Sequence, residues 1–323
     1  MQMQLDRRTL LAGSAALGLS PLAMVPAARA AAPMTNSVGA PYMRYKLGEF
    51  EITAFNDGTR VAPNPEKIFG VNQKPEDVAA AAEANFLPGD KLVNSFTPVL
   101  VNTGKELVLF DSGNGANGRP ATGHLASQIA AAGFSPDQID VVVITHCHPD
   151  HIGGLMENGT ALAPRARYVI GEAEYAFWSS PDRANGPAAN AAKIVQANVV
   201  PLKDKMTFVK NDGEAVAGIR AVEAFGHTPG HMAWHVESGG KRLLIGADFC
   251  NHYVLSLRYP KWHVSFDANK DKAVETRLRL LDMLSADRIP FTSYHMPFPA
   301  VGFVEKSADG GYRFVPASYQ LML

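Results

Sequence analysis

The sequence predicts an α/β protein that folds as a four-layer αββα sandwich, and three observations support this. Strand and helix patterns alternate along the chain, as expected where helices cover sheets. The run "IDVVVIT" over residues 139–145 is almost wholly apolar, which is typical of a strand inside a covered sheet. Each half of the chain also contains a hairpin pattern, so we expect two sheets packed face to face, with helices on their outer faces.

Patterns in the first half of the chain predict one sheet and one helix. A lead-in over residues 31–45 is rich in Pro, Ala and Ser, and we expect it to pack loosely. In the helix pattern "HLASQIAAAG", Leu125, Ile129 and Ala132 recur at helical spacing and Gly133 marks the end. The strand patterns of this half cover residues 49–57, residues 97–113 with a hairpin turn at 103–105, and residues 139–145.

The second half of the chain again alternates strand and helix patterns. The run "EAEYAFW" over residues 172–178 begins a helix, and a polar loop follows over residues 179–187. A longer helix is expected over residues 271–284. Its expected buried stripe consists of Val274, Leu278, Leu281 and Leu284. The strand patterns cover residues 166–171, 218–226, 232–248 with a turn at Gly239-Gly240, and 289–295, which we expect to be the last core strand.

The first 30 residues have the features of a twin-arginine export signal. Arg7-Arg8 precedes a moderately apolar stretch of small residues, and Ala28-Arg29-Ala30 is similar to a signal-peptidase site. The stretch from Leu10 to Val25 contains proline and is short for a membrane span. We therefore predict a cleaved signal peptide over residues 1–30, one folded domain over residues 31–323, and a periplasmic or secreted protein.

Composition argues against several classes of partner. The formal net charge is −1 at pH 7, so the chain has no basic excess for nucleic acid or an anionic membrane surface. We expect a small-molecule substrate, no nucleic acid and, after signal cleavage, no membrane. With only two cysteines, Cys147 and Cys250, no disulfide framework is expected, and we predict two free, buried thiols near the site.

The run "THCHPDHIGG" over residues 145–154 predicts a metal site. His146 and His148 are two residues apart in an extended segment, so their side chains point to the same side and can share a metal. Asp150 and His151 fall where the chain turns toward a helix, which suits a second ion nearby. Further candidate ligands follow later strands: His227 and His231 in "FGHTPGH", Asp248 after "LLIG", and His295 after "FTSY".

In this order, H-x-H-x-D-H, G-H-T-P-G-H, Asp and His resemble the metallo-β-lactamase superfamily of binuclear metallohydrolases. The resemblance runs from about residue 43 to the end of the chain and implies the same αββα fold. More narrowly, "LGEFEITAFNDGT", "LVNTG", "ITHCHPDHIGGLM", "HMPFP" and "GYRFVP" look like the methyl parathion hydrolase branch, which also contains lactone- and aryl-ester-cleaving relatives. Relatives of this branch are commonly homodimeric, so the resemblance also implies a homodimer.

The resemblance implies two divalent metal ions, with Asp248 bridging them. We expect zinc, because imidazole and carboxylate ligands without thiolate suit it, although manganese, cobalt or iron could occupy the same set. We expect His227 to order its loop around the site rather than to bind metal. By resemblance, one ion is held by His146, His148 and His231, and the other by Asp150, His151 and His295.

Two such ions would lower the pKa of a bridging water and polarise the oxygen of the bond under attack. We therefore expect hydrolysis by a metal-bridging hydroxide, with Asp150 and Asp248 as catalytic residues and Asp150 able to orient the hydroxide or shuttle its proton. The alternatives are a dedicated organophosphate hydrolase, a β-lactamase, a thioesterase of the glyoxalase II type, and a metal-binding protein without catalysis. Asp248 argues against a β-lactamase, whose zinc sites generally lack a bridging aspartate, and the export signal argues against the thioesterase.

Substrate preference is indicated by aromatic residues and by two departures from related patterns. Trp178 matches an aromatic residue that lines the pocket in the methyl parathion hydrolase branch, and Phe96 and Phe266 could add apolar walls, with plain core packing as the alternative. Gly118 stands where organophosphate specialists tend to carry an aromatic residue. Asn251 stands where acyl-homoserine lactonases place a tyrosine, and we expect it to contact substrate. These departures favour a generalist hydrolase of lactones and aryl esters with incidental phosphotriesterase activity.

Overall fold

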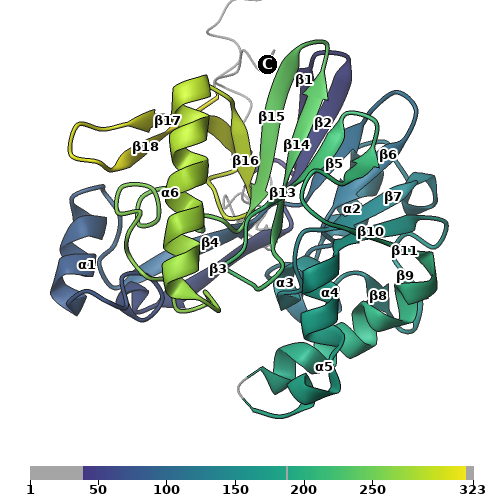
Figure 1. Ribbon diagram of the computed structural model, residues 1–323, viewed down its shortest axis with the longest axis horizontal. Helices are drawn as coiled ribbons and strands as arrows, with labels where there is room; N and C mark the ends of the chain where they lie inside the picture. Colours follow the sequence, from purple (N-terminus) through teal and green to yellow (C-terminus); the bar gives the residue numbers. More distant parts are fainter. Residues whose placement is uncertain (1–38, 187, 318–323) are drawn as a thin grey trace, which may run out of the picture. The chain divides into compact units, whose positions relative to one another are not determined.

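Two sheets of seven strands each form the centre of the computed structural model, which describes residues 39–186 and 188–317 (Figure 1). The fold lies in one compact unit that begins at Ala40. The predicted signal peptide over residues 1–30 lies outside the described residues. Within the described ranges, no helix combines the length and the apolar character needed to cross a membrane.

The first sheet is antiparallel at one side and parallel at the other. β1, β2, β5 and β6 pair antiparallel in that order, and β6, β7, β10 and β11 continue as parallel neighbours. Its strands are β1 (Tyr42–Leu47), β2 (Phe50–Phe55), β5 (Val99–Asn102), β6 (Leu107–Phe110), β7 (Val141–Ile144), β10 (Arg167–Gly171) and β11 (Met206–Val209).

The second sheet follows the chain in order from β12 to β18. Its β14–β15 hairpin turns on Gly239 and Gly240, whose φ angles of 56° and 74° match the two-residue turn with left-handed backbone that the Gly-Gly pair predicts. The strands are β12 (Glu214–Val216), β13 (Ile219–Glu223), β14 (Met232–Ser238), β15 (Lys241–Ala247), β16 (Phe291–Ser293), β17 (Val301–Lys306) and β18 (Tyr312–Pro316).

Helices cover the outer faces of the two sheets. Two short pairs of strands stand outside the sheets: β3 (Gly58–Pro63) with β4 (Lys91–Phe96), and β8 (Met156–Glu157) with β9 (Thr160–Ala161). The α-helices are α1 (Pro75–Glu83), α2 (Leu125–Ala131), α3 (Pro149–Ile152), α4 (Glu172–Ser179), α5 (Ala189–Asn198) and α6 (Lys270–Asp287).

Strand β7 shows how the layers form. Val141 and Val143 pack into the core between the sheets, together with Trp234 of β14, whereas Val142 and Ile144 pack on the opposite face with side chains of α2 and α5. On the outer face of the second sheet, leucines of α6 pack against β15 and β16, and α6 runs along this sheet in Figure 1. The predicted four-layer αββα sandwich is therefore confirmed.

The structure corrects three expectations. β16 is not the last core strand, because β17 and β18 extend the same sheet. The lead-in over residues 31–45 ends sooner than expected, since β1 begins at Tyr42. In α6 the buried stripe is rotated from the predicted one: Val274 and Leu278 are only partly buried, and the buried residues are Ala273, Thr276, Arg277, Leu280, Leu281 and Leu284.

Residues 58–96, for which the sequence predicted no element, hold β3, α1 and β4. They contribute Phe69, Ala81 and Leu92 to a separate apolar cluster. The other buried members of this cluster, including Leu255, come from residues 248–269, the long connection between β15 and α6, which we call the α6 approach. This packing holds the α6 approach in place beside the site described next.

Candidate metal centre

The predicted ligands come from connections at the ends of strands in both sheets. Local sequence sets their direction: His148 is the extended residue before α3, and Pro149 is the first residue of that helix. The segments are residues 145–152 after β7, with His146, His148, Asp150 and His151; residues 224–231 before β14, with His227 and His231; residue 248 after β15; and residue 295 after β16.

The structure brings these side chains together in two groups, each with potential ligand atoms within 4.8 Å of one another. The first group is His146, His148, His227 and Asp248, and the second is Asp150, His151 and His295. His231 is the one predicted ligand outside both groups.

Asp248 lies between the two groups. Its Oδ2 is 3.9 Å from Nε2 of His146, in the first group, and 3.2 Å from Nε2 of His295, in the second. Its Oδ1 is 3.3 Å from Nε2 of His151. A carboxylate with both oxygens directed at two ligand groups has the position that a metal bridge requires.

Several of these atoms have no hydrogen-bond partner although they are buried. They include Nε2 of His146, Nε2 of His151 and Oδ1 of Asp248. Burying a polar atom without a partner costs about 1–3 kcal/mol, so such a concentration at one place needs a compensating group. Imidazole nitrogens and carboxylate oxygens are the ligand types that zinc and similar divalent ions prefer, so the residues present fit a pair of such ions.

In His151 and His295, hydrogen bonds to Nδ1 fix the orientation of the ring and so set the direction of Nε2. Nδ1 of His151 is 2.8 Å from Oδ2 of Asp111, and Nδ1 of His295 is 2.7 Å from the carbonyl oxygen of Ser95. Because a carboxylate or carbonyl can only accept, each Nδ1 carries a proton, so Nε2 is the ring nitrogen left to bind a metal ion, which would displace any proton there. The sequence analysis missed Asp111; its signal was a polar residue directly after an apolar strand.

The two histidines of "FGHTPGH" are both buried at the site but make different contacts. His227 belongs to the first group: its Nε2 is 2.8 Å from Nδ1 of His148 and 3.3 Å from Oδ2 of Asp248. His231 is also buried beside His146, with ring centroids 4.9 Å apart, but its Nε2 accepts the backbone N–H of Asp248 at 3.0 Å. Its Nδ1 is buried without a partner. The assignment of His231 rather than His227 as a ligand stays a prediction.

The electrostatics keep several imidazoles neutral, as metal ligands must be. Burial, reinforced by neighbouring imidazoles, lowers the pKa of His146 and of His148 well below the usual value, and lowers that of His231 to about 3. For Asp248, burial alone would raise the pKa, but His295 and His151 outweigh it and hold the pKa well below its usual value. The carboxylate of Asp248 is therefore ionised, and the neutral rings of His146, His148 and His231 each have one nitrogen lone pair.

Glu174, another residue that the sequence analysis missed, connects two of these loops from α4. It is fully buried, and its carboxylate accepts the backbone N–H groups of Cys147 and Gly230 and side-chain hydrogens of Trp178 and Thr228. A Cβ on Gly230 would lie 2.0 Å from the backbone nitrogen of Glu174, so only glycine permits this approach. A glutamate in the first turn of a helix looks solvent-exposed in the sequence, so nothing there marked it.

Three of the four predicted substrate residues lie beside the ligand groups but are buried. The ring of Trp178 lies edge-on to His148 with centroids 6.2 Å apart, and that of Phe96 lies edge-on to His295 at 5.3 Å. Asn251 donates from Nδ2 to Oδ2 of Asp248 at 3.0 Å. Only Phe266 is open to solvent, with 54% of its surface exposed.

The structure leaves no room at Gly118 for the aromatic residue that organophosphate specialists tend to carry there. Gly118 is buried, and a Cβ there would lie 2.2 Å from Oγ1 of Thr122 and 2.6 Å from Cβ of Asn114. An aromatic side chain has no room at this position, so Gly118 serves close backbone packing. The two cysteines are free and buried, as predicted.

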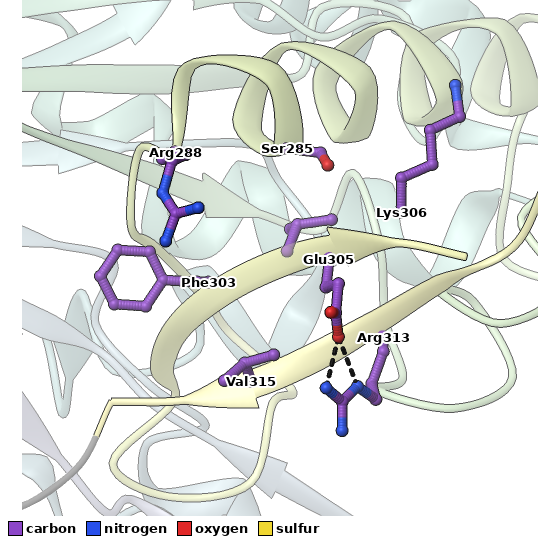
Figure 2. A pocket seen from close by; sticks show the side chains of 8 residues that line it. Ser285, Arg288, Phe303, Glu305, Lys306, Arg313 and Val315 are labelled. Atoms are coloured by element: carbon purple, nitrogen blue, oxygen red, sulfur yellow. Dashed lines mark hydrogen bonds and ion pairs between the residues drawn. The ribbon is translucent and has the colours of Figure 1, made fainter. Parts of the chain in front are cut away.

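A cavity of about 470 Å³ lies apart from these groups, between the end of α6 and the β17–β18 hairpin. Figure 2 shows its lining, with the ion pair between Glu305 and Arg313 across the hairpin. No predicted site residue lines it. A smaller cavity of about 260 Å³, lined mainly by apolar residues, includes His252 and Tyr253, which directly follow Asn251 in the chain.

Comparison with known structures gives consistent matches. AidC, a dizinc quorum-quenching lactonase solved with the product N-hexanoyl-L-homoserine, superposes with a TM-score of 0.79 and 26% identity, covering 86% of this chain and 98% of its own. AbOPH, a hydrolase of the beta-lactamase superfamily, superposes with a TM-score of 0.81 and 25% identity, covering 88% of this chain and 100% of its own. A probable metal-dependent hydrolase from Staphylococcus aureus superposes with a TM-score of 0.69 and 23% identity, covering 84% of this chain and 99% of its own. This last match shows the fold alone.

A family model covers more than half of the chain. Residues 97–290, which contain all of the candidate ligands except His295, match the model of the metallo-beta-lactamase superfamily. The αββα fold and the two His/Asp groups are consistent with this family match. The chain therefore belongs to the metallo-beta-lactamase superfamily and is a metal-dependent hydrolase.

Proposed function

We propose that this chain is a binuclear metallohydrolase of lactones and aryl esters, from the methyl parathion hydrolase branch, with promiscuous phosphotriesterase activity. The observation that carries the proposal is the position of Asp248, whose two carboxylate oxygens are directed at the two groups of candidate ligands. The lactonase AidC, which is dizinc, supports zinc as the metal and a lactone as the substrate class.

When bound, two zinc ions would supply a nucleophilic water of lowered pKa and polarise the carbonyl oxygen under attack. The protein's part is to hold the ligands in place and to handle a proton. Oδ2 of Asp150 lies 3.5 Å from Nε2 of His151 and 3.4 Å from Nε2 of His295, and its side chain is 24% exposed. Asp150 can therefore take a proton at the site and release it to solvent. Asp248 is buried and serves as the fixed anionic centre.

The preference for carbonyl substrates with a flat apolar group rests on the surroundings. Phe96 and Trp178 place aromatic rings against His295 and His148, and Phe266 is exposed. The 260 Å³ cavity offers apolar space for an aryl or acyl group near the residues that follow Asn251. A phosphotriester needs room for three substituents around phosphorus, and poor orientation alone can reduce a rate by about 10²-fold.

A substrate panel on metal-replete enzyme tests the proposal. It should include dihydrocoumarin, aliphatic lactones, phenyl and p-nitrophenyl esters, methyl parathion and paraoxon. We expect kcat/KM for the aryl lactones and esters to exceed that for methyl parathion by about tenfold or more, as the orientation argument requires. Faster turnover of methyl parathion than of dihydrocoumarin would instead make the enzyme a dedicated organophosphate hydrolase.

The remaining alternatives have their own diagnostic substrates. Turnover of nitrocefin would indicate a β-lactamase, and preferential cleavage of a glutathione thioester would indicate a thioesterase. Full metal loading without turnover of any substrate in the panel would indicate a binding protein.

Export and assembly complete the proposal. The arginine pair and small-residue stretch of residues 1–30 support twin-arginine export to the periplasm or medium with cleavage of that segment, and the resemblance to the methyl parathion hydrolase branch supports a homodimer. Cell fractionation with N-terminal sequencing of the mature protein tests the first. Light scattering after size-exclusion chromatography tests the second.

A further inference from the structure

A buried tyrosine, Tyr294, lies against the second ligand group, which consists of Asp150, His151 and His295. Its hydroxyl donates to the backbone carbonyl oxygen of Asp150 at 2.8 Å. Its ring lies over the ring of His151, with centroids 3.8 Å apart and planes inclined by 31°. Tyr294 also directly precedes His295, whose ring lies edge-on to it at 5.2 Å. One side chain is thus in contact with all three members of the group.

The helix that carries Asp150 and His151 is too short to hold itself in place. α3 (Pro149–Ile152) is a single turn, and isolated turns of helix are unstable because few of their backbone groups are bonded internally. The N–H of Gly154, which would bond to the carbonyl of Asp150 if the helix continued, donates instead to the carbonyl of Gly113 at 3.0 Å. Within residues 39–186 and 188–317, the hydroxyl of Tyr294 is the recorded donor to the carbonyl of Asp150. This hydroxyl therefore replaces a missing helical hydrogen bond at a predicted ligand.

Tyr294 is itself held by segments other than α3. Its backbone N–H donates to the carbonyl oxygen of Ala247 at 3.2 Å, and its own carbonyl oxygen accepts the N–H of Thr97 at 3.0 Å. Its ring lies edge-on to that of Phe96, with centroids 6.3 Å apart. Ala247 ends β15 and directly precedes Asp248, so the tyrosine is tied to the segment that carries the central carboxylate. It can therefore serve as a fixed support for α3.

The ring of His151 needs a second constraint besides its hydrogen bond. The bond from Nδ1 to Oδ2 of Asp111, 2.8 Å long, fixes one direction in the ring plane but leaves the ring able to tilt about that direction. A phenol ring stacked at 3.8 Å blocks this tilt by direct contact. The position of Nε2 is then defined, 3.3 Å from Oδ1 of Asp248 and 3.5 Å from Oδ2 of Asp150.

We propose that Tyr294 is a positioning residue for the second ligand group: its hydroxyl fixes the backbone at Asp150, and its ring fixes the plane of His151, so that both residues direct their ligand atoms at one metal ion. Tyr294 acts through these two residues and does not bind the ion. The inference rests on the proposed function in requiring that this group binds metal, and it does not depend on which ester or lactone is cleaved.

Tyr294→Phe tests the hydroxyl, because it removes one oxygen atom and keeps the ring. Cobalt(II) is titrated into metal-free protein against a chromophoric chelator. We expect the affinity for one of two ions to fall by about 10- to 100-fold, as is typical when a group that orients a metal ligand is lost, while the other ion keeps most of its affinity. The visible absorption bands of the weakened cobalt should shift, because Asp150 moves with its backbone. Wild-type affinity for both ions with an unchanged spectrum would overturn the proposal.

Tyr294→Leu tests the ring. It removes the stacked surface as well as the hydroxyl, so the ring of His151 is free to tilt about its bond to Asp111. We expect the same cobalt ion to be weakened further than in Tyr294→Phe. Equal affinities in the two variants would show that the stacking does not position His151, and a loss confined to the other ion would place Tyr294 at the wrong group; either result counts against the proposal.

Tyr168→Phe is the matched control, because it makes the same chemical change outside the two ligand groups. Tyr168 in β10 is 1% exposed, and its hydroxyl donates to the backbone carbonyl oxygen of Ala163 at 3.0 Å. The melting temperatures of the metal-free Tyr168→Phe and Tyr294→Phe proteins should fall by similar amounts, since each loses one buried hydrogen bond. Only Tyr294→Phe should weaken cobalt binding, and equal weakening in both variants would reveal general damage and overturn the proposal.

The wild-type titration separates this proposal from the proposed function. Wild-type protein that binds no cobalt would overturn the metal centre on which both rest. Binding of two ions by the wild type, together with an unaffected Tyr294→Phe variant, would overturn the positioning role alone.

Discussion

Replacing Glu174 with glutamine should loosen the connection between two metal-binding loops. Oε1 of Glu174 accepts the backbone N–H of Cys147 at 2.8 Å and the indole N–H of Trp178 at 2.9 Å. Oε2 accepts the hydroxyl of Thr228 at 2.7 Å and the backbone N–H of Gly230 at 2.9 Å. Cys147 lies between His146 and His148 in the sequence, and Gly230 precedes His231, so the carboxylate holds both loops against α4.

The size of the effect follows from these four donors. Whichever way the glutamine amide turns, its NH₂ group faces two of them. If it faces Thr228 and Gly230, the hydroxyl can rotate to accept, but the Gly230 N–H stays buried without an acceptor at a cost of about 1–3 kcal/mol. The two remaining bonds lose their charge assistance, about 1 kcal/mol each. Burial raises the pKa of Glu174, so the neutral amide recovers part of this by avoiding desolvation of a charge.

We therefore expect the free energy of unfolding to fall by about 2–4 kcal/mol, which corresponds to a decrease in melting temperature of roughly 3–7 °C for a chain of this size. Calorimetry on metal-free protein measures this directly. Glu172→Gln is the matched control, because Glu172 lies in the same helix turn but is exposed, and within the described ranges its ion pair is with Lys210. The reasoning fails if Glu174→Gln melts within a degree of the wild type, or if Glu172→Gln is equally destabilising.

Four further outcomes are expected. Elemental analysis should find about two metal ions per chain, with activity lost on chelation and restored by zinc, since the ligand set is too large for one tetrahedral ion; a single ion in fully active enzyme would contradict this. Asp248→Ala should reduce metal content at both sites, whereas retention of one tightly bound ion would show that it serves one site only. His231→Ala should remove an ion that His227→Ala only weakens, and the reverse order in metal analysis would exchange their roles. Gly118→Ala should lower the free energy of unfolding by about 1–3 kcal/mol through its clash with Thr122, measured by urea denaturation, without raising triesterase activity; an undestabilised variant would show that the site has room.

Local patterns in the sequence were enough to predict the elements that frame the site. The apolar run of β7 is a property of consecutive residues, and the strand was predicted at residues 139–145 and observed at Val141–Ile144. The grouping of His146 and His148 followed from their spacing, because alternate side chains of an extended segment point to the same side, and both lie in the first ligand group. Asp248 and His295 were candidates because each directly follows a predicted strand, and the family resemblance added their roles as bridge and ligand.

Other elements could not be predicted in this way. The segment of residues 58–96 packs against the α6 approach, far away in the sequence. The strands β17 and β18 pair antiparallel with their sequence neighbours, but their short, mixed sequences gave no strong strand signal. Gly118 stood where organophosphate specialists tend to carry an aromatic residue, but the reason for glycine is the proximity of Thr122 and Asn114 in the folded chain.

The sequence by itself determined the fold class, the superfamily resemblance and the kinds of side chain that meet at the metal centre, because spacing and polarity within a few residues carry that information. Only the tertiary structure decided how those side chains are held. Glu174, Asp111 and Asp267 each bond to at least one group 27 or more residues away, and Arg277 is a charged helix residue that turns out to be fully buried. A buried charge is stable only when distant segments supply its partners, and which segments meet is decided by the packing of the two sheets and their helices.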